Sequence, residues 1–318
     1  MSDTDSSGSD VGTEPTRRAM LRRTEPTRRA VIRRTGPIAV GAVAATAGCI
    51  DRGGDEASEN RVDRDVADPP VIAHRGFAAE YPENTVAAVE AAAAVVDRIE
   101  LDVRRCGSGE LVTFHDATLG RVTDATGRVD RTPYERLADL SVEGSGEPVP
   151  TLAEALDAVP ADAWVMLDLK SRGVAADAVA TGADRGHDLA VTADDPAVLE
   201  AVRRADPAVP TVYSVRESVP ARLLRPLIPG RSEGTELPRW AYPSQDVAGM
   251  VETATELGCA AVSPRYELCL RTDIVSRAAD AGLRVLPWTV ASARGYEALA
   301  AAGVDAVVSD VTRGLRET

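Results

Sequence analysis

The sequence predicts an eight-stranded parallel β/α barrel of the TIM type, a (β/α)8 barrel. The part of the chain after residue 70 has 248 residues (318 − 70), close to the ~250 typical of this fold. Short apolar segments alternate there with alanine-rich helical segments, which indicates a parallel sheet covered on both faces, and eight such units favour closure into a barrel. The segments expected to form strands are residues 71–76, 98–103, 164–170, 188–193, 211–215, 259–264, 283–290 and 305–310.

Residues 1–48 have the three-part pattern of a secretory signal. An arginine-rich block, EPTRRAMLRRT (14–24), is repeated as EPTRRAVIRRT (25–35), and a short apolar run of small residues then leads to Cys49. Paired arginines before such a run are typical of twin-arginine export signals. The residues before Cys49 resemble a lipobox, where cleavage exposes a cysteine that carries a lipid. We therefore expect an exported protein, held by lipidated Cys49 on the extracytoplasmic face of the cell membrane; the alternative is an uncleaved anchor with an ordinary cysteine.

The segment between Cys49 and the barrel has no apolar period. Together with Cys49 it is expected to form a flexible acidic linker over residues 49–70, so that the folded domain covers residues 71–318. Over the whole chain 50 Asp plus Glu outnumber 36 Lys plus Arg. We expect no nucleic-acid partner, because a phosphate backbone attracts basic surfaces.

The cations of the chain are almost all arginine. Of the 36 Lys plus Arg, only Lys170 is a lysine. An acidic composition this poor in lysine is similar to that of haloarchaeal proteins, which indicates adaptation to concentrated salt. A GC-rich genome would also favour arginine, and that alternative stays open.

One apolar segment breaks the alternation of strands and helices. Residues 111–116 follow RIELDVRRC (98–106) after only GSGE, whereas a parallel crossover needs a dozen or more residues. An antiparallel hairpin through Ser108 and Gly109 is therefore expected after the second strand. Counting back from this turn places His115 beside Glu100 and Asp102.

Acidic side chains occupy the second and third barrel strands. Glu100 and Asp102 are two positions apart and so point to the same side of an otherwise apolar strand, while Asp168 precedes Lys170 by two positions on the third. Carboxylates buried together repel each other, and a divalent cation usually resolves that repulsion. The alternatives are a solvated rim for the acids and a structural salt bridge for Lys170, although Lys170 is equally suited to bind phosphate.

Two of the three histidines lie close to these acids in the predicted fold. His74 and Arg75 end the first strand, at the barrel face that carries catalytic groups, and His115 follows the hairpin; His187 lies in a loop and is expected at the surface. Two imidazoles, three carboxylates and two cations suit cleavage of a phosphodiester. The metal and the cations would neutralise the phosphoryl oxygens, while one histidine removes a proton and the other supplies one.

These segments resemble the glycerophosphodiester phosphodiesterases, whose barrel is of the phospholipase C-like phosphodiesterase type. The resemblance extends over the whole region from residue 71 to 318 and follows the family's order of motifs: HRG (74–76), PENT (82–85), IELDV (99–103), FHDATLGRVTDATG (114–127), VPTLAEAL (149–156), LDLK (167–170), PWTV (287–290) and GVDAVVSD (303–310).

The resemblance implies metal-dependent hydrolysis of glycerophosphodiesters to glycerol phosphate and an alcohol. It implies roles for ten residues: His74 and His115 as the acid–base pair, Arg75, Lys170 and Trp288 as substrate contacts, Glu83 and Asn84 as supports behind them, and Glu100, Asp102 and Asp168 as ligands of Mg or Ca. Asp168 stands where the family usually has the longer Glu. Two alternatives are phospholipase D-like hydrolysis of lysophospholipids, which an apolar trough beside Trp288 would favour, and a non-catalytic, lipid-anchored surface receptor.

Overall fold

The computed structural model of the protein describes residues 68–215 and 246–312. The chain divides into two units, residues 1–60 and 61–318, and the described residues all belong to the second. The expected export signal, Cys49 and almost all of the acidic linker lie outside the described residues. Within the described part of the chain, no helix is long and apolar enough to cross a lipid bilayer.

Each of the eight segments expected to form a barrel strand contains one, although the first strand ends before His74–Gly76, which form a 3-10 turn, and the strand within residues 283–290 spans only two residues of its predicted segment. The strands are β1 (Val71–Ala73), β2 (Arg98–Arg105), β3 (Leu111–Thr113), β4 (Trp164–Leu169), β5 (Asp188–Ala193), β6 (Thr211–Ser214), β7 (Ala261–Ser263), β8 (Arg284–Val285) and β9 (Val307–Ser309). Their order in the sheet is β8-β7-β6-β5-β4-β2-β1-β9, and every neighbouring pair along this path is parallel.

Backbone hydrogen bonds join the two ends of this path into a ring. The chain at and after β8 bonds to the β9 segment, with Asp305 N donating to Val285 O at 3.0 Å, Val308 N to Pro287 O at 2.9 Å and Val290 N to Val308 O at 2.9 Å. The fold is therefore a (β/α)8 TIM-type barrel, as the sequence predicts.

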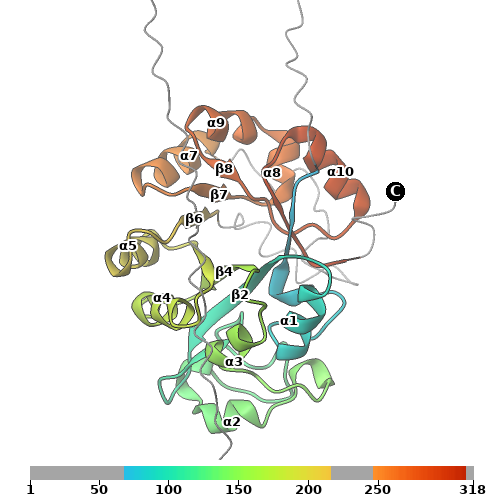
Figure 1. Ribbon diagram of the computed structural model, residues 1–318, viewed down its shortest axis with the longest axis vertical. Coiled ribbons are helices and arrows are strands. Elements are labelled where there is room, and N and C mark those ends of the chain that lie inside the picture. The colour runs from blue at the N-terminus through green and yellow to red at the C-terminus, as the bar shows by residue number, and fades with distance from the viewer. Residues whose placement is uncertain (1–67, 216–245, 313–318) are drawn as a thin grey trace, which may run out of the picture. The chain divides into compact units, whose positions relative to one another are not determined.

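The helices cover the outside of the strands (Figure 1). The α-helices among the described residues are α1 (Val86–Ala93), α2 (Tyr134–Ala138), α3 (Leu152–Asp157), α4 (Ala175–Ala183), α5 (Pro196–Ala205), α7 (Val247–Glu256), α8 (Tyr266–Arg271), α9 (Ile274–Asp280) and α10 (Ala293–Ala302). Local signals set their starts: the Thr85 hydroxyl accepts from Ala88 N at the start of α1, and Thr151 with Glu154 forms a capping box at α3.

The third strand forms the expected antiparallel hairpin with β2. The register pairs Val103 with Thr113 and Arg105 with Leu111, and Phe114 N continues the ladder by donating to Asp102 O at 3.0 Å. His115, the next residue, is thereby placed at the level of the acidic pair of β2.

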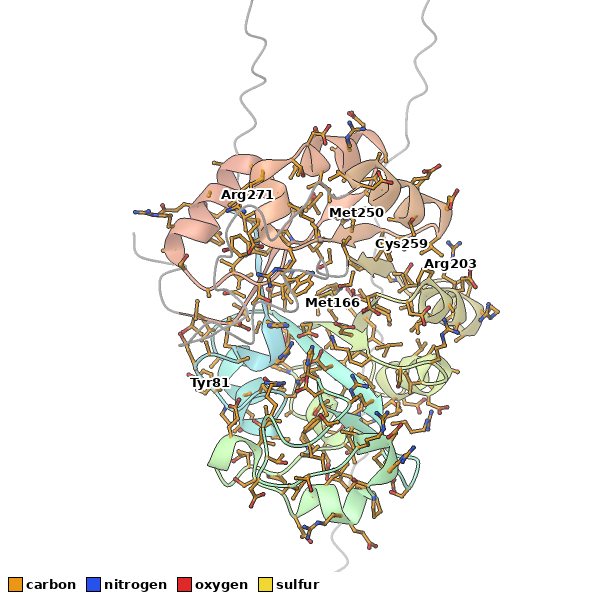
Figure 2. The ribbon with its side chains drawn as sticks, turned by 180° about the vertical axis from the view of Figure 1, so that it is seen from behind. Tyr81, Met166, Arg203, Met250, Cys259 and Arg271 are labelled. Carbon is orange, nitrogen blue, oxygen red and sulfur yellow. The ribbon has the colours of Figure 1, made fainter. Side chains whose placement is uncertain are left out.

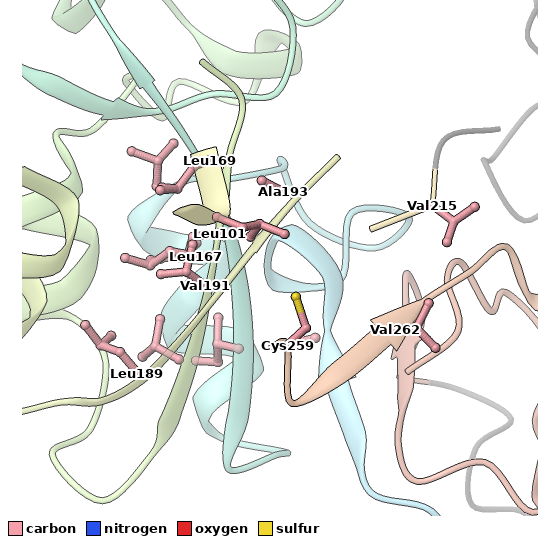
Figure 3. Close-up of a cluster of buried hydrophobic side chains, with 14 of the residues drawn as sticks. Leu101, Leu167, Leu169, Leu189, Val191, Ala193, Val215, Cys259 and Val262 are labelled. Atoms are coloured by element: carbon pink, nitrogen blue, oxygen red, sulfur yellow. The ribbon is translucent and has the colours of Figure 1, made fainter. Parts of the chain in front are cut away.

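Side chains alternate between two separate cores along the strands. Leu101, Leu167 and Val191 point outward into the main core beneath the helices (Figure 3). Met166 points into the barrel, where it belongs to a smaller apolar cluster (Figure 2). Because successive side chains of a strand face opposite ways, the acids of β2 and β4 face the barrel interior, above that cluster.

Candidate active site

Three carboxylates converge at the carboxyl ends of β2 and β4. The parallel register sets Asp102 directly opposite Asp168, and each of Glu100, Asp102 and Asp168 contributes an oxygen to a group whose members lie within 4.8 Å of one another. Glu100 and Asp102 are buried, and Asp168 is half-buried. Oxygen donors gathered in this way fit a hard divalent cation such as Mg²⁺ or Ca²⁺.

Asp102 lies at the centre of the polar contacts, with 0% of its surface exposed. Its Oδ2 accepts from Asn84 Nδ2 at 2.8 Å and lies 2.9 Å from Arg75 Nε. Its Oδ1 lies 2.9 Å from Lys170 Nζ. Burial alone would raise the pKa of this carboxyl, but Lys170 and Arg75 hold the pKa well below its usual range.

Lys170 bridges the two facing aspartates. Its ammonium lies 2.5 Å from Asp168 Oδ2 as well as 2.9 Å from Asp102 Oδ1. Burial would lower the pKa of the amine, yet the two aspartates raise it. The only lysine of the chain is therefore a fixed positive charge beside the carboxylate cluster.

The turn after β1 brings Arg75 back to the barrel mouth. Arg75 has a φ of 52° and Gly76 a φ of 77°, and a Cβ on Gly76 would meet Ala88 atoms at 2.7 Å, so only glycine fits there. The Arg75 backbone N donates to Glu100 Oε2 at 2.9 Å, and its guanidinium donates to Glu83 Oε2 at 3.2 Å.

Asn84 holds the next turn against β2. It has a φ of 61°, and its side chain accepts from Asp102 N at 3.0 Å while donating to the Asp102 carboxylate. Left-handed backbone at non-glycine residues costs about 1–3 kcal/mol each and gathers at functional sites. Arg75 and Asn84 follow that pattern.

Each of the two histidines has a carboxylate at its Nδ1. His74 Nδ1 lies 2.6 Å from Asp310 Oδ1, and His115 Nδ1 lies 2.6 Å from Asp116 Oδ1. A carboxylate on Nδ1 fixes the ring orientation and leaves Nε2 for other partners. His74 Nε2 is directed toward the acids, 4.0 Å from Glu100 Oε2.

The surroundings shift the two imidazoles in opposite directions. Burial and the Arg75 charge would lower the pKa of His74, but Asp310 and Glu100 together raise it to about 9. Burial, together with Arg75 and Lys170, lowers the pKa of His115 in spite of its carboxylate neighbours. One ring is therefore held protonated and the other neutral near pH 7.

Sequence reasoning missed several residues of this arrangement. The sequence does contain a pattern that indicates Asp116 and Asp310: Asp116 directly follows His115, and Asp310 ends the last predicted strand. Arg104 lies two positions after Asp102 on the same inward face, and its guanidinium donates to the carbonyls of His115 at 2.8 Å and Lys170 at 3.4 Å. It thereby ties the segments that carry those two side chains.

His187 is not at the surface, where the sequence predicts it. It is half-buried, with Nε2 2.9 Å from Leu156 O, because its loop packs back on the end of α3.

Trp288 follows β8 on the same barrel face as the acids. Its Nε1 donates to Ser263 O at 2.9 Å, and its ring lies 4.9 Å from the Arg265 guanidinium. The described contacts thus place Trp288 on the β7–β8 side of the mouth, whereas the carboxylates lie on the β2–β4 side.

Residues 74–313 match the sequence pattern of the Glycerophosphoryl diester phosphodiesterase family. The chain belongs to this family. Every site residue named above, from His74 to Asp310, lies within the matched residues, in agreement with the order of motifs in the sequence.

Individual relatives resemble the chain over different lengths. A glycerophosphodiester phosphodiesterase of Caldanaerobacter subterraneus is 26% identical, and the match covers 76% of this chain and 93% of that protein. An uncharacterized protein of Mycobacterium tuberculosis is 36% identical over a match that covers 32% of this chain and only 39% of that protein. Among solved structures, a phosphodiesterase of Oleispira antarctica in complex with the product sn-glycerol-3-phosphate has a TM-score of 0.60 and 26% identity, covering 76% of this chain and 93% of that one.

The carboxylate cluster predicts a pH-dependent stability for the metal-free protein. Burial, followed by the Asp102 charge, raises the pKa of Glu100 from 4.5 to about 8. Between pH 4.5 and about 8, Glu100 holds a proton in the folded state but not in the unfolded state. This proton makes its full contribution to the free energy of unfolding below pH 4.5, and the contribution is lost as pH rises toward 8. In chelator, the stability of the wild type relative to E100Q should fall by up to about 1.4 kcal/mol per pH unit across this window.

Urea unfolding of both proteins at several pH values between 5 and 8.5 measures this difference in the free energy of unfolding. Its slope with pH should correspond to about one bound proton. Comparing the two curves removes the titration of groups that do not interact with Glu100. Parallel curves for wild type and E100Q would contradict the assignment of the proton to Glu100.

Proposed function

We propose that the protein is a metal-dependent phosphoric diester hydrolase that splits glycerophosphodiesters into glycerol phosphate and an alcohol. The observation that carries this proposal is the convergence of two carboxylate-held imidazoles with three clustered acids at one barrel mouth. Membership of the Glycerophosphoryl diester phosphodiesterase family supports it. The Oleispira antarctica relative, solved with sn-glycerol-3-phosphate as product, supports the same substrate class.

Glu100, Asp102 and Asp168 would hold the Mg or Ca ion. When bound, the cation supplies positive charge that stabilises the developing charge on the phosphoryl oxygens. Lys170 and Arg75 add two fixed positive charges next to the same acids, and Lys170, one-fifth exposed, presents its ammonium for a phosphate oxygen. These charges act in a partly water-excluded site, where they count for more than in bulk water.

His74 and His115 would perform the proton transfers. With Nδ1 held by Asp310 and Asp116, each ring presents Nε2 in a fixed direction. One imidazole would remove the proton of the attacking nucleophile, and the other would protonate the alcohol oxygen as it leaves. Behind them, Asn84 holds the Asp102 carboxylate and Glu83 holds Arg75. Trp288 would form the opposite wall, against the alcohol group.

Release of glycerol phosphate from glycerophosphocholine tests the reaction. H74A and H115A should each lower kcat by about 10²- to 10⁴-fold, the usual worth of a general acid or base, and chelator should abolish turnover until Mg²⁺ or Ca²⁺ is restored. H187A is the matched control, because His187 contacts Leu156 away from the site, and it should stay active.

Four outcomes would count against this function. Turnover that persists in chelator would exclude the metal, and turnover that persists in H74A would exclude the acid–base role. A wild type that cleaves lysophosphatidylcholine but not glycerophosphocholine would favour the phospholipase D-like alternative. Absence of turnover on every diester would favour a non-catalytic receptor.

We also propose that the protein is exported by the twin-arginine route and anchored by lipid on Cys49. The support is the sequence alone: the repeated arginine block and the lipobox-like residues before Cys49. In cells that express the full chain, C49S should move the protein from the membrane fraction to the soluble fraction, measured by immunoblot of both. C106S, at a buried thiol of the barrel domain, is the control. Unchanged membrane association of C49S would contradict the anchor.

Finally, we propose that the surface is adapted to concentrated salt. A formal charge of −14, with one lysine among the 36 cations, supports this. Salt screens repulsion between the acids, since the Debye length falls to about 3 Å at 1 M. The melting temperature should therefore rise as KCl increases from about 0.1 M to about 3 M. A melting temperature that is constant or falls would contradict the proposal.

A further inference from the structure

Arg121 connects the two sides of the site through carboxylates. It lies in the loop between β3 and α2, where its Nε donates to Asp116 Oδ2 at 2.6 Å. Its Nη1 donates to Glu83 Oε2 at 2.7 Å and its Nη2 to Glu83 Oε1 at 2.6 Å. One guanidinium therefore binds two acids with three of its five N–H groups, the Glu83 carboxylate being held at both oxygens.

Asp116 and Glu83 each accept a further hydrogen bond, and each from a different side chain of the site. Asp116 Oδ1 accepts from His115 Nδ1 at 2.6 Å, while Glu83 Oε2 accepts from Arg75 Nη1 at 3.2 Å. The result is a continuous chain of charge-assisted hydrogen bonds, Arg75–Glu83–Arg121–Asp116–His115. It links the segment after β1 to the segment after β3 through Arg121.

The position of Arg121 is itself set by packing. Leu119 and Val122, on either side of it, are buried at 1% and 4% exposure in the apolar cluster beneath this loop. The Arg121 side chain is 44% exposed, whereas the Glu83 side chain it binds is only 5% exposed. The loop thus holds a half-exposed guanidinium against a buried carboxylate.

Charge favours the same arrangement. Burial would raise the pKa values of Glu83 and Asp116, but Arg121 helps to lower both, that of Asp116 to about 2. Both acids therefore stay ionised as acceptors for Arg75 and His115. A lysine could supply the charge but not the three directed N–H groups, since its ammonium lacks the planar fork.

We propose that Arg121 is a positioning residue for the reaction, which sets the His115 ring and the Arg75 guanidinium in place through Asp116 and Glu83. This inference rests on the proposed phosphodiesterase activity and assigns to Arg121 an action on kcat without contact to the substrate. Outer partners that orient the groups of an active site are typically worth about 10- to 100-fold in activity.

The chain offers a matched control in Arg128. It binds Asp130 with two hydrogen bonds of 2.8 Å and is 46% exposed, close to the value for Arg121, but that pair is exposed and binds no site residue in the described contacts. R121A and R121K should both lower kcat for glycerophosphocholine by about 10- to 100-fold. R128A should change kcat by less than about twofold. Melting temperatures of the three variants report whether each is folded.

A double-mutant cycle with Asp116 separates positioning from a general loss of structure. If Arg121 acts through Asp116, R121A/D116N should be within about threefold of the slower single variant, because the second change removes a contact already lost. Added guanidinium ion should restore part of the turnover of R121A, and ammonium ion should not. The wild type and R128A under the same additions correct for effects of the salts themselves.

Several results would overturn the inference. One is an R121A or R121K enzyme with kcat close to that of the wild type. A second is that R121A and D116N lower kcat by factors that simply multiply in the double variant. A third is an R121A enzyme whose turnover guanidinium fails to restore. A variant that does not fold at all, without recovery in guanidinium, would show a structural role instead. Failure of the proposed function is distinct, because the wild type would then have no diesterase activity against which to compare the variants.

Discussion

The carboxylate of Asp102 is fully buried inside the barrel mouth, and this is the constraint on which the rest of the site depends. An ionised carboxylate in such a place costs several kcal/mol of desolvation unless charges and donors surround it. The chain meets that demand from three directions, with Arg75 after β1, Asn84 before α1 and Lys170 after β4. Arg75 and Asn84, both with left-handed backbone, contact the same carboxylate oxygen, Asp102 Oδ2.

The barrel explains why these groups can meet. Parallel strands end at one face, so residues far apart in the sequence become neighbours there. The alternation of β2 sends Leu101 to the core under the helices and Glu100 and Asp102 to the interior. Hydrophobic packing therefore fixes the strands, while the inward positions at their carboxyl ends remain for charged groups that repel one another unless a cation or Lys170 lies among them.

Much of this arrangement follows from sequence patterns, and the rest does not for physical reasons. The strands and the hairpin depend on local periods of two and on short turns, which a sequence displays directly. The meeting of Glu100, Asp102 and Asp168 follows from the parallel barrel, which sets β2 beside β4. The pairing of His74 with Asp310 depends on the first strand, β1, lying beside the last, β9, and the bridge through Arg121 depends on the path of an irregular loop. The partial burial of His187 likewise depends on its contact with Leu156 of α3, 31 positions earlier in the sequence. Such contacts depend on tertiary packing, which local patterns do not encode.

A double-mutant cycle on unfolding free energy tests most directly the claim that Asp102 keeps its charge by pairing with Lys170. D102N and K170M should each destabilise the protein by about 3–5 kcal/mol, since each leaves a buried partner uncompensated. The destabilisation of the double variant should be smaller than the sum of the two single destabilisations by more than about 1.5 kcal/mol. The exposed Arg172–Asp195 pair should show coupling of at most about 1 kcal/mol in the same experiment. Additive effects of D102N and K170M would contradict the account.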